Sequence, residues 1–329
     1  MVQDQDIPQS GKGQNPRRTR QGYRRGAAHN HGRGCPRIFS SLLRRYKKLK
    51  CANQFVEQSS GLLYVYDFRT KKYGKRSPIV TCAINNYYKQ AWAEAGVDPY
   101  ALEDFFAKVV EPHGKAGLER LNSMATDMRP EETVAVLSLI ESQRLRVPRQ
   151  ARLMKELHDC QVASLYGEEF AAAYHRGEIK LTEVYRFDAM RACLGEMMMW
   201  CGRMEWLVIK APQNVSFITT DNPVIFFNPR IIPPLEAGIA FAGTKVLYPM
   251  SPSRMLMMYH PECRRSGPLD TVPRPPKEDR GIKVHFWPEP ADEGTAQIWN
   301  GMLVQMCDHT VVGTNENDIR DAVGRRYGK

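Results

Sequence analysis

The stretch "SFITTDNPVIFFNP", which runs from Ser216 to Pro229, contains two apolar segments with the pattern of β-strands. Between them lies Asp221-Asn222-Pro223, so a carboxylate and an amide interrupt sequence that is otherwise typical of a protein core. Asp accepts hydrogen bonds from nearby backbone amides and Pro sets the direction in which the chain leaves, so the tripeptide favours a turn. The same polar pair is also a candidate functional site, and both interpretations stay open at this point.

Strands are predicted on both sides of this turn. Three apolar segments with strand character lie at 205–212, 244–251 and 254–260. Nearer the N-terminus, "GLLYVYDFRTKKYGKRSP" predicts a β-hairpin with "RTKK" as its turn. The alternation along this hairpin places on one face Leu63, Val65 and Asp67, and on the other face Leu62, Tyr64, Tyr66 and Phe68.

Helices are predicted in the middle of the chain and near its C-terminus. The first starts at Asp98-Pro99, where an N-cap residue precedes proline, and Pro112 should end or kink it. Its expected inward positions are Leu102, Phe105, Phe106, Val109 and Val110. The second starts near Pro130, with an inward stripe of Val136, Leu139, Ile140, Gln143 and Val147. Further helices are expected at about 150–176, 182–203 and 292–307, with a last one capped near Asn315.

Helices gathered in the middle and strands gathered later favour an α+β protein over alternating βαβ units. We therefore expect an N-terminal β-hairpin, a central helical bundle and a C-terminal, mostly antiparallel sheet packed with helices. Residues 59–329 are predicted to form this single domain. Residues 1–58 are predicted to be a basic segment, either disordered or aberrant, because their first 33 residues lack a hydrophobic period.

The net charge of +11 lies entirely in the first 50 residues, which hold 13 Lys and Arg against two Asp. The rest of the chain is balanced, so its charge does not indicate that the folded part binds nucleic acid. The basic N-terminal segment is a candidate for non-specific contact with nucleic acid, and the alternative is an extension without a partner.

The remaining composition favours a cytoplasmic protein. No run of about 18 apolar residues occurs, so no membrane span is expected, and the N-terminus lacks the apolar core of a signal peptide. The eight cysteines are irregularly spaced and include no CxxC pair, which favours reduced thiols and excludes a zinc ribbon.

A few polar residues lie where the pattern predicts core or a strand seam. Gln143 falls in an apolar helical stripe, where an unpaired amide costs about 1–3 kcal/mol. Glu103 and Glu111 are eight residues apart, about 80° around a helix axis, so they share a broad face without being stacked. The candidate site residues are Glu103, Glu111, Gln143, Arg144, Asp221, Asn222 and Asn300.

Four segments resemble a bacterial family, the domain of unknown function numbered 4238 (DUF 4238). They are "GLLYVYDFRTKKYGKRSP", "ESQRLRVPRQ", "FITTDNPVI" and "LYPMSPSRMLMM", and together the resemblance covers about residues 58–315. The Asp-Asn-Pro seam is its most specific part. The positions that match the family's pattern are Gln143, Arg144, Pro148, Asp221, Asn222, Pro223, Pro249, Ser251, Pro252 and Asn300.

The N-terminus departs from the family, whose members open with paired histidines in an "HHYVPxFL" stretch before the hairpin. This chain has "GCPRIFSSLLRRYKKLKCANQFVEQSSG" there. A frameshifted or mis-started reading frame is one hypothesis, and a genuine new arm is the other. If the histidines belong to a site, this chain lacks part of it.

Two functions remain open. In the first, the protein is a metal-dependent hydrolase, with a nuclease of an accessory or defence-type gene as the type that the family context implies. Glu103, Glu111 and Asp221 would then bind a divalent metal ion or activate water, while the amides and Arg144 would orient the substrate. In the second, the protein is a non-enzymatic binding or scaffold module, and the same residues form a structural hydrogen-bond network.

Overall fold

In the computed structural model, the chain crosses between two β-sheets at the Asp221-Asn222-Pro223 turn. Strand β4 (Thr219–Thr220), before the turn, is an edge of a four-stranded sheet with the order β2-β1-β9-β4, here called sheet A. Strand β5 (Ile225–Phe227), after it, is an edge of a five-stranded sheet with the order β5-β6-β7-β3-β8, here called sheet B. The structure describes residues 54–81, 87, 89, 96, 98–125, 128–179, 184–273 and 282–327.

Sheet A is built on the predicted hairpin, which is confirmed. Its strands are β1 (Leu63–Asp67) and β2 (Lys72–Arg76), paired antiparallel. Strand β9 (Thr310–Gly313), from near the C-terminus, pairs antiparallel with β1 on one side and with β4 on the other. Sheet A therefore joins three parts of the chain that lie far apart in the sequence.

Sheet B contains the most apolar strands. Its central strands β3 (Glu205–Lys210), β7 (Arg254–Tyr259) and β6 (Lys245–Ser251) are antiparallel to their neighbours in this set. Strand β8 (Val284–Phe286), which the sequence analysis does not predict, pairs parallel with β3. The prediction of an α+β protein with a mostly antiparallel C-terminal sheet packed with helices is confirmed.

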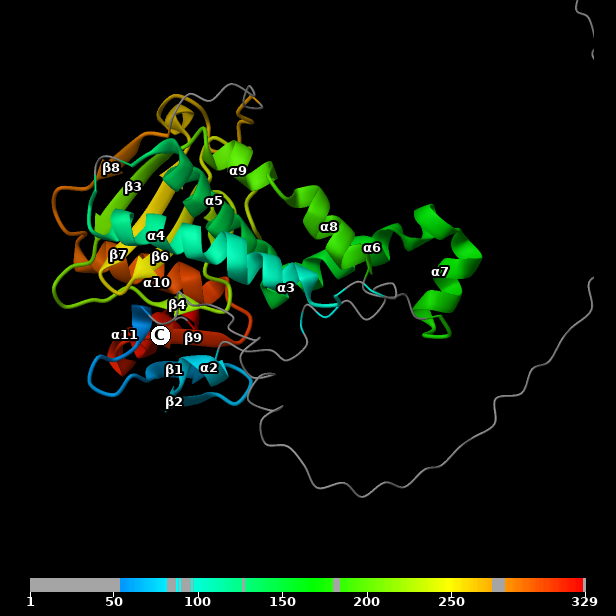
Figure 1. Cartoon of the computed structure of the whole chain (residues 1–329), viewed down its shortest axis with the longest axis horizontal. Helices are drawn as coiled ribbons and strands as arrows, with labels where there is room; N and C mark the ends of the chain where they lie inside the picture. Colours follow the sequence, from blue (N-terminus) through cyan, green and yellow to red (C-terminus); the bar gives the residue numbers. More distant parts are fainter. Residues whose placement is uncertain are drawn as a thin grey trace, which may run out of the picture. The chain divides into compact units, whose positions relative to one another are not determined.

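Helices cover both faces of sheet B (Figure 1). Helices α4 (Glu111–Asn122), α5 (Pro130–Leu145) and α9 (Glu196–Cys201) pack on the face that carries Trp206 and Val208. The opposite face, which carries Leu207 and Ile209, shares a core with α10 (Glu293–Gln305) and α11 (Glu316–Arg326). The remaining helices are α2 (Pro78–Thr81), α3 (Ala101–Phe105), α6 (Pro148–Tyr166), α7 (Glu168–His175) and α8 (Val184–Cys193).

Alternation along the strands explains why both faces are buried. Successive side chains of a strand point to opposite faces, so a continuous apolar segment such as "WLVI" of β3 serves two cores. One core also includes residues of β1 and β9, so α10 and α11 are packed between the two sheets. The crossing at Asp221 therefore leads from one side of this helical layer to the other.

Two predicted helices are divided by glycine. The expected helix at 150–176 is α6 followed by α7, and Gly167 between them has a φ of 90°. The expected helix at 182–203 is likewise α8 followed by α9, with Gly195 also at 90°. Glycine adopts this left-handed region without the steric cost that a Cβ atom brings, so each glycine redirects the chain. The prediction of single helices at these places is wrong.

The first predicted helix does not end at Pro112, which lies in the first turn of α4; a π-helix just before it, Phe106–Val110, joins α3 to α4. The amide of Glu111 donates to the carbonyl of Phe106, five residues back. The extra residue in this turn shifts the inward face, so Phe106 is buried while Phe105 and Val109 are exposed. The prediction that all five apolar positions point inward is wrong for these two.

The predictions about residues 1–53 lie outside the described residues, and the boundary at residue 58 stays a prediction. Phe55 is fully buried against Leu63, Val65 and Val312, so packing on sheet A includes residues just before that boundary. The described residues belong to one compact unit, 42–329. Within them, each helix is too short or too polar to cross a lipid bilayer.

We predict that Gly114→Ala destabilises the protein although alanine favours helices. A Cβ atom at Gly114 would lie 2.4 Å from the Cβ atom of Leu139, because α4 and α5 pack closely there. Overpacking of this kind costs about 1–3 kcal/mol. The matched control is Gly301→Ala on α10, where the nearest atom would be 3.4 Å away, and which should gain up to about 1 kcal/mol. Urea unfolding of both variants tests this, and equal stabilities would contradict it.

Candidate functional site

The seam residues lie where β4 ends and sheet A meets the α10–β9 connection. The hydroxyl of Thr220 accepts from the amide of Asn222 at 3.1 Å and donates to its carbonyl at 2.9 Å. This small hydrogen-bonded ring turns the chain out of sheet A, and Pro223 directs it towards sheet B. The sequence prediction of a turn at this tripeptide therefore agrees with the local structure.

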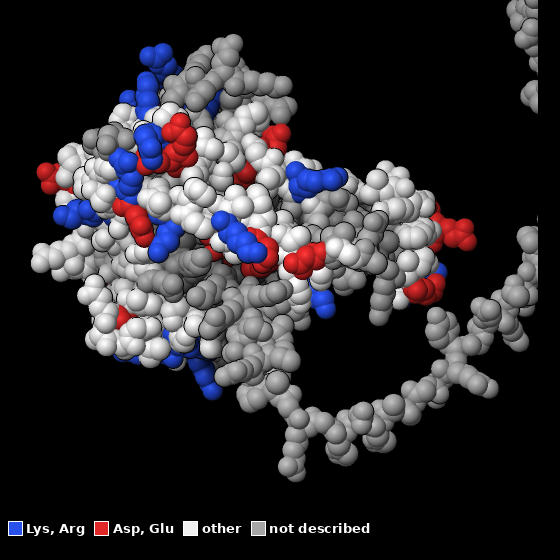
Figure 2. Space-filling model, viewed as in Figure 1, with Lys and Arg blue, Asp and Glu red and all other residues white. Residues whose placement is uncertain are grey.

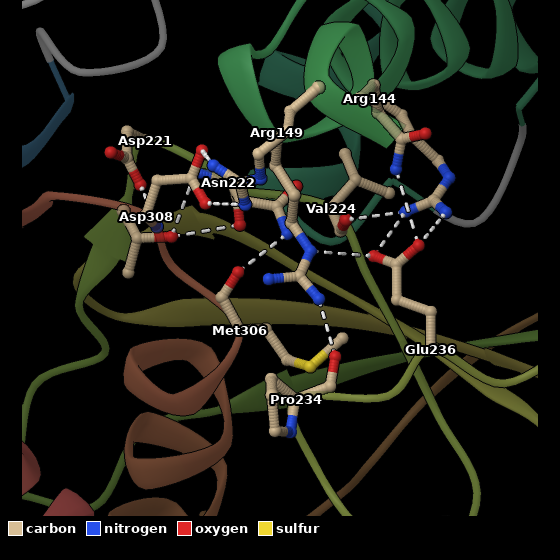
Figure 3. A network of polar contacts seen from close by, with 12 residues as sticks. Arg144, Arg149, Asp221, Asn222, Val224, Pro234, Glu236, Met306 and Asp308 are labelled. Atoms are coloured by element: carbon tan, nitrogen blue, oxygen red, sulfur yellow. Dashed lines mark hydrogen bonds and ion pairs between the residues drawn. The ribbon is translucent and has the colours of Figure 1, made fainter. Parts of the chain in front are cut away.

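The carboxylate of Asp221 is bound by backbone amides (Figure 3). Its Oδ1 accepts from the amide of Asp308 at 2.9 Å, and its Oδ2 accepts from those of His309 at 2.7 Å and Thr310 at 3.1 Å. The amide of Asp221 donates to the carbonyl of Thr310 at 3.0 Å. Burial raises the pKa of Asp221, and the amides of Asp308 and His309 oppose that rise. The side chain thus fastens the start of β9 to the end of β4.

The two candidate asparagines also bind the backbone. Asn222 is fully buried, and its Nδ2 donates to the carbonyl of Met306 at 3.0 Å. Asn300, on α10, accepts from the amide of Ile218 at 3.2 Å and donates to the carbonyl of Ser216 at 2.9 Å. Together these amides tie the segment that carries β4 to α10 and to the residue that follows it.

Arg144 connects α5 to the loop between β5 and β6 (Figure 3). Its guanidinium lies 3.7 Å from the centre of the Phe226 ring and donates to both oxygens of Glu236, at 3.3 and 2.7 Å. It also donates to the carbonyl of Val224 at 3.2 Å. Burial would raise the pKa of Glu236, but Arg144 and then Arg149 hold it below its usual value. Gln143, the neighbouring candidate, is buried on α5.

Glu103 and Glu111 meet at a single arginine. Arg146, just after α5, donates to Glu111 at 3.0 Å and to Glu103 at 3.3 Å, and all three side chains are buried. The π-helix between the two glutamates takes one extra residue, so eight residues turn the helix about as far as seven do in a regular one. The separation then falls from about 80° to about 20°. The expectation that the two acids are not stacked is therefore corrected.

The candidate site residues do not share one set of partners in the structure. Arg146 holds Glu103 and Glu111, whereas backbone groups hold Asp221, Asn222 and Asn300. Within the part of the chain that is described, no group of three or more His, Cys, Asp or Glu residues is arranged to hold a metal ion. The roles assigned to these residues from the sequence stay predictions.

Asp67 is a further charged residue of this region that the sequence analysis did not select. It ends β1, is 2% exposed and pairs across the sheet with Thr310. It accepts from Arg69 at 3.2 Å through both Nε and Nη2, and from Arg76 at 3.4 Å. Its position on the face of Leu63 and Val65 was visible in the alternation, and a carboxylate on an apolar face is the signal that marks it.

The contacts of Asp67 predict a pH-dependent contribution to stability. Its bond to Arg69, above all, lowers the pKa of Asp67 to about 2 from the ordinary 3.8. Because the folded-state pKa is the lower one, the stabilisation is present above pH 3.8 and is lost as the pH falls through about 2. The free energy of unfolding of the native chain should exceed that of Asp67→Asn by on the order of 2 kcal/mol at neutral pH. Urea unfolding across this range measures the difference, and a constant difference would contradict the prediction.

We also predict that Arg146→Met strongly destabilises the fold. Removing the guanidinium takes a cation away from two buried carboxylates, and breaking a buried ion pair costs about 3–5 kcal/mol. Adding Glu103→Gln and Glu111→Gln should restore part of the loss. The control is Arg176→Met, whose ion pair with Glu178 is exposed and should contribute about 0–1 kcal/mol. A loss for Arg146→Met as small as that of the control would argue against a structural role.

Comparison with known proteins identifies a family but no characterised relative. No curated protein and no solved structure matches the chain. A family model described as "Protein of unknown function (DUF4238)" matches residues 38–317, which include the hairpin, the helices from α2 to α10 and the seam. The family expected from the four sequence segments is thus confirmed. Since the match spans most of the 329 residues, the chain belongs to the DUF4238 family.

Proposed function

We propose that this protein is a non-enzymatic binding module, whose candidate residues form a structural hydrogen-bond network. Asp221 carries the proposal, because its carboxylate accepts from three consecutive backbone amides. Turning the carboxylate towards a metal ion or a substrate would leave these partly buried amides without their acceptor, which favours the structural role.

The asparagines support the same interpretation. A substrate-orienting amide directs its donor or acceptor towards a ligand, but Asn300 directs both at backbone groups, and Asn222 directs its donor at the carbonyl of Met306. Arg144 is similarly engaged by Glu236 and by a backbone carbonyl. In this proposal the network keeps the two sheets and the helices in one fixed arrangement, and the cytoplasmic location expected from the sequence is retained.

The competing proposal, a metal-dependent hydrolase, makes Asp221 a ligand or a base. The two proposals differ in what Asp221→Asn does. As an anchor, the substitution leaves backbone amides without an acceptor and should cost about 1–3 kcal/mol in the free energy of unfolding. As a metal ligand, it should abolish a metal-dependent rise in melting temperature, since a ligand at 100 times its dissociation constant adds about 2.7 kcal/mol.

We predict that Asp221→Asn lowers the melting temperature by the same amount with and without Mg²⁺, Mn²⁺, Ca²⁺ or Zn²⁺. The matched control is Asp270→Asn, because Asp270 is exposed and accepts from the backbone amide of Gly267. Its melting temperature should stay close to that of the native chain. A metal-dependent stabilisation of the native chain that Asp221→Asn loses and Asp270→Asn keeps would overturn the proposal and favour the hydrolase.

A further inference from the structure

Three partly exposed arginines surround one end of sheet A, and buried carboxylates hold them. The side chains of Arg69, Arg76 and Arg152 are 63%, 39% and 50% exposed. Those of their partners Asp67 and Asp308 are 4% exposed. The negative charges therefore lie beneath the surface, and the positive charges face the solvent.

The sheet register places these groups in one row. Asp67 pairs with Thr310 on β9, and Asp221 binds the backbone of Thr310 from the other side. Neighbouring strands lie about 4.8 Å apart, so the Cα atoms of Asp67 and Asp221 are roughly 10 Å apart. Paired positions in adjacent strands point to the same face. The row therefore presents its polar side chains on the face of the sheet that also carries Arg76.

The three arginines are electrostatically connected through the carboxylates. Arg69 and Arg76 both contact Oδ2 of Asp67, at 3.2 and 3.4 Å. Arg152, which reaches over from α6, donates to both oxygens of Asp308 at 2.6 and 3.0 Å, and the amide of Asp308 binds Asp221. The bond to Asp67 raises the pKa of Arg69, and the bond to Asp308 raises that of Arg152, with a further contribution to each from the charge of Asp221.

The carboxylates orient the guanidinium groups without using all their donors. A guanidinium has five N–H groups, and Arg76 gives Asp67 one contact, at 3.4 Å. Lys72, which pairs with Asp67 across the hairpin, is exposed beside them. In the view of Figure 2, Lys and Arg side chains lie at the lower edge, where Figure 1 places β1 and β2.

We propose that Arg69, Arg76 and Arg152 form a binding site for the phosphate group of a small molecule, such as a nucleotide. Arg69 and Arg152 each give two N–H groups to a buried carboxylate, and this holds their remaining N–H groups, with those of Arg76, in place for the oxygens of a phosphate. The cluster has three arginines, fewer than the roughly 6–10 phosphate contacts that a protein can make along a nucleic acid duplex. This inference rests on the proposed binding function and names the class of ligand.

The test is calorimetric titration of the full-length protein with inorganic phosphate, pyrophosphate and ATP. At least one of these should bind, and Arg69→Gln and Arg152→Gln should each weaken binding about tenfold or more, because each removes charge-assisted hydrogen bonds. Arg69→Lys keeps the positive charge but lacks the fork of N–H groups. Its affinity should lie between that of the native chain and that of Arg69→Gln. The matched control is Arg176→Gln, which removes an arginine of similar exposure, 59%, from its pair with Glu178 and should bind like the native chain.

The outcomes separate the sources of the phosphate. Binding of phosphate and ATP with equal affinity assigns the site to the free anion, and tighter binding of ATP assigns it to a nucleotide. No binding of any of the three, or native affinity in folded Arg69→Gln and Arg152→Gln, overturns the proposal. Binding of a single-stranded oligonucleotide alone, with steep salt dependence, also overturns it and assigns the surface to nucleic acid.

Failure of the phosphate proposal and failure of the proposed function give different experimental results. The role of Asp221 is measured as a loss of unfolding free energy without any phosphate compound. A protein that binds no phosphate but shows that loss would keep the structural network and lose only this ligand. A protein with a metal-dependent stabilisation carried by Asp221 would lose the binding-module proposal, whatever its affinity for phosphate.

Discussion

The bonds from the Asp221 carboxylate to the backbone amides of Asp308, His309 and Thr310 fasten the start of β9 to the end of β4. The chain leaves sheet A at this residue, and β9 enters sheet A at the amides it binds. Without an acceptor there, the amides of Asp308, His309 and Thr310 would need other partners in a partly buried place. One side chain thus sets both where β9 begins and where the chain departs for sheet B.

Buried charged side chains of the helices likewise bind groups that lie far away in the sequence. Arg144 fixes α5 to the loop between β5 and β6, and Arg146 fixes the α3–α4 helix to the end of α5. Glu141, also on α5, accepts from the amides of Gly195 and Met197 and so holds the start of α9. Such groups are costly when they lose a partner, so they favour one arrangement of helices over its alternatives.

The charges at the end of sheet A are arranged differently. The buried groups of the helices have both signs in the interior, whereas Asp67 and Asp308 are buried under arginines that remain open to solvent. A buried acid beneath an exposed base holds the base in a defined orientation while leaving its charge at the surface. This difference in exposure distinguishes the arginines at sheet A from the internal ion pairs of the helices.

Local signals were enough to predict the hairpin, the strands of sheet B other than β8 and the cap at Asn315, because periodicity and capping depend on near neighbours in the chain. Chain composition alone placed the excess positive charge before residue 51. Tertiary structure decided the pairing of β9 with β1, the insertion of a π-turn that brings Glu103 to Glu111, and the partners of Asp221. Each of these depends on groups far apart in the sequence, and a buried polar atom takes whichever partner the packed fold brings within hydrogen-bond distance.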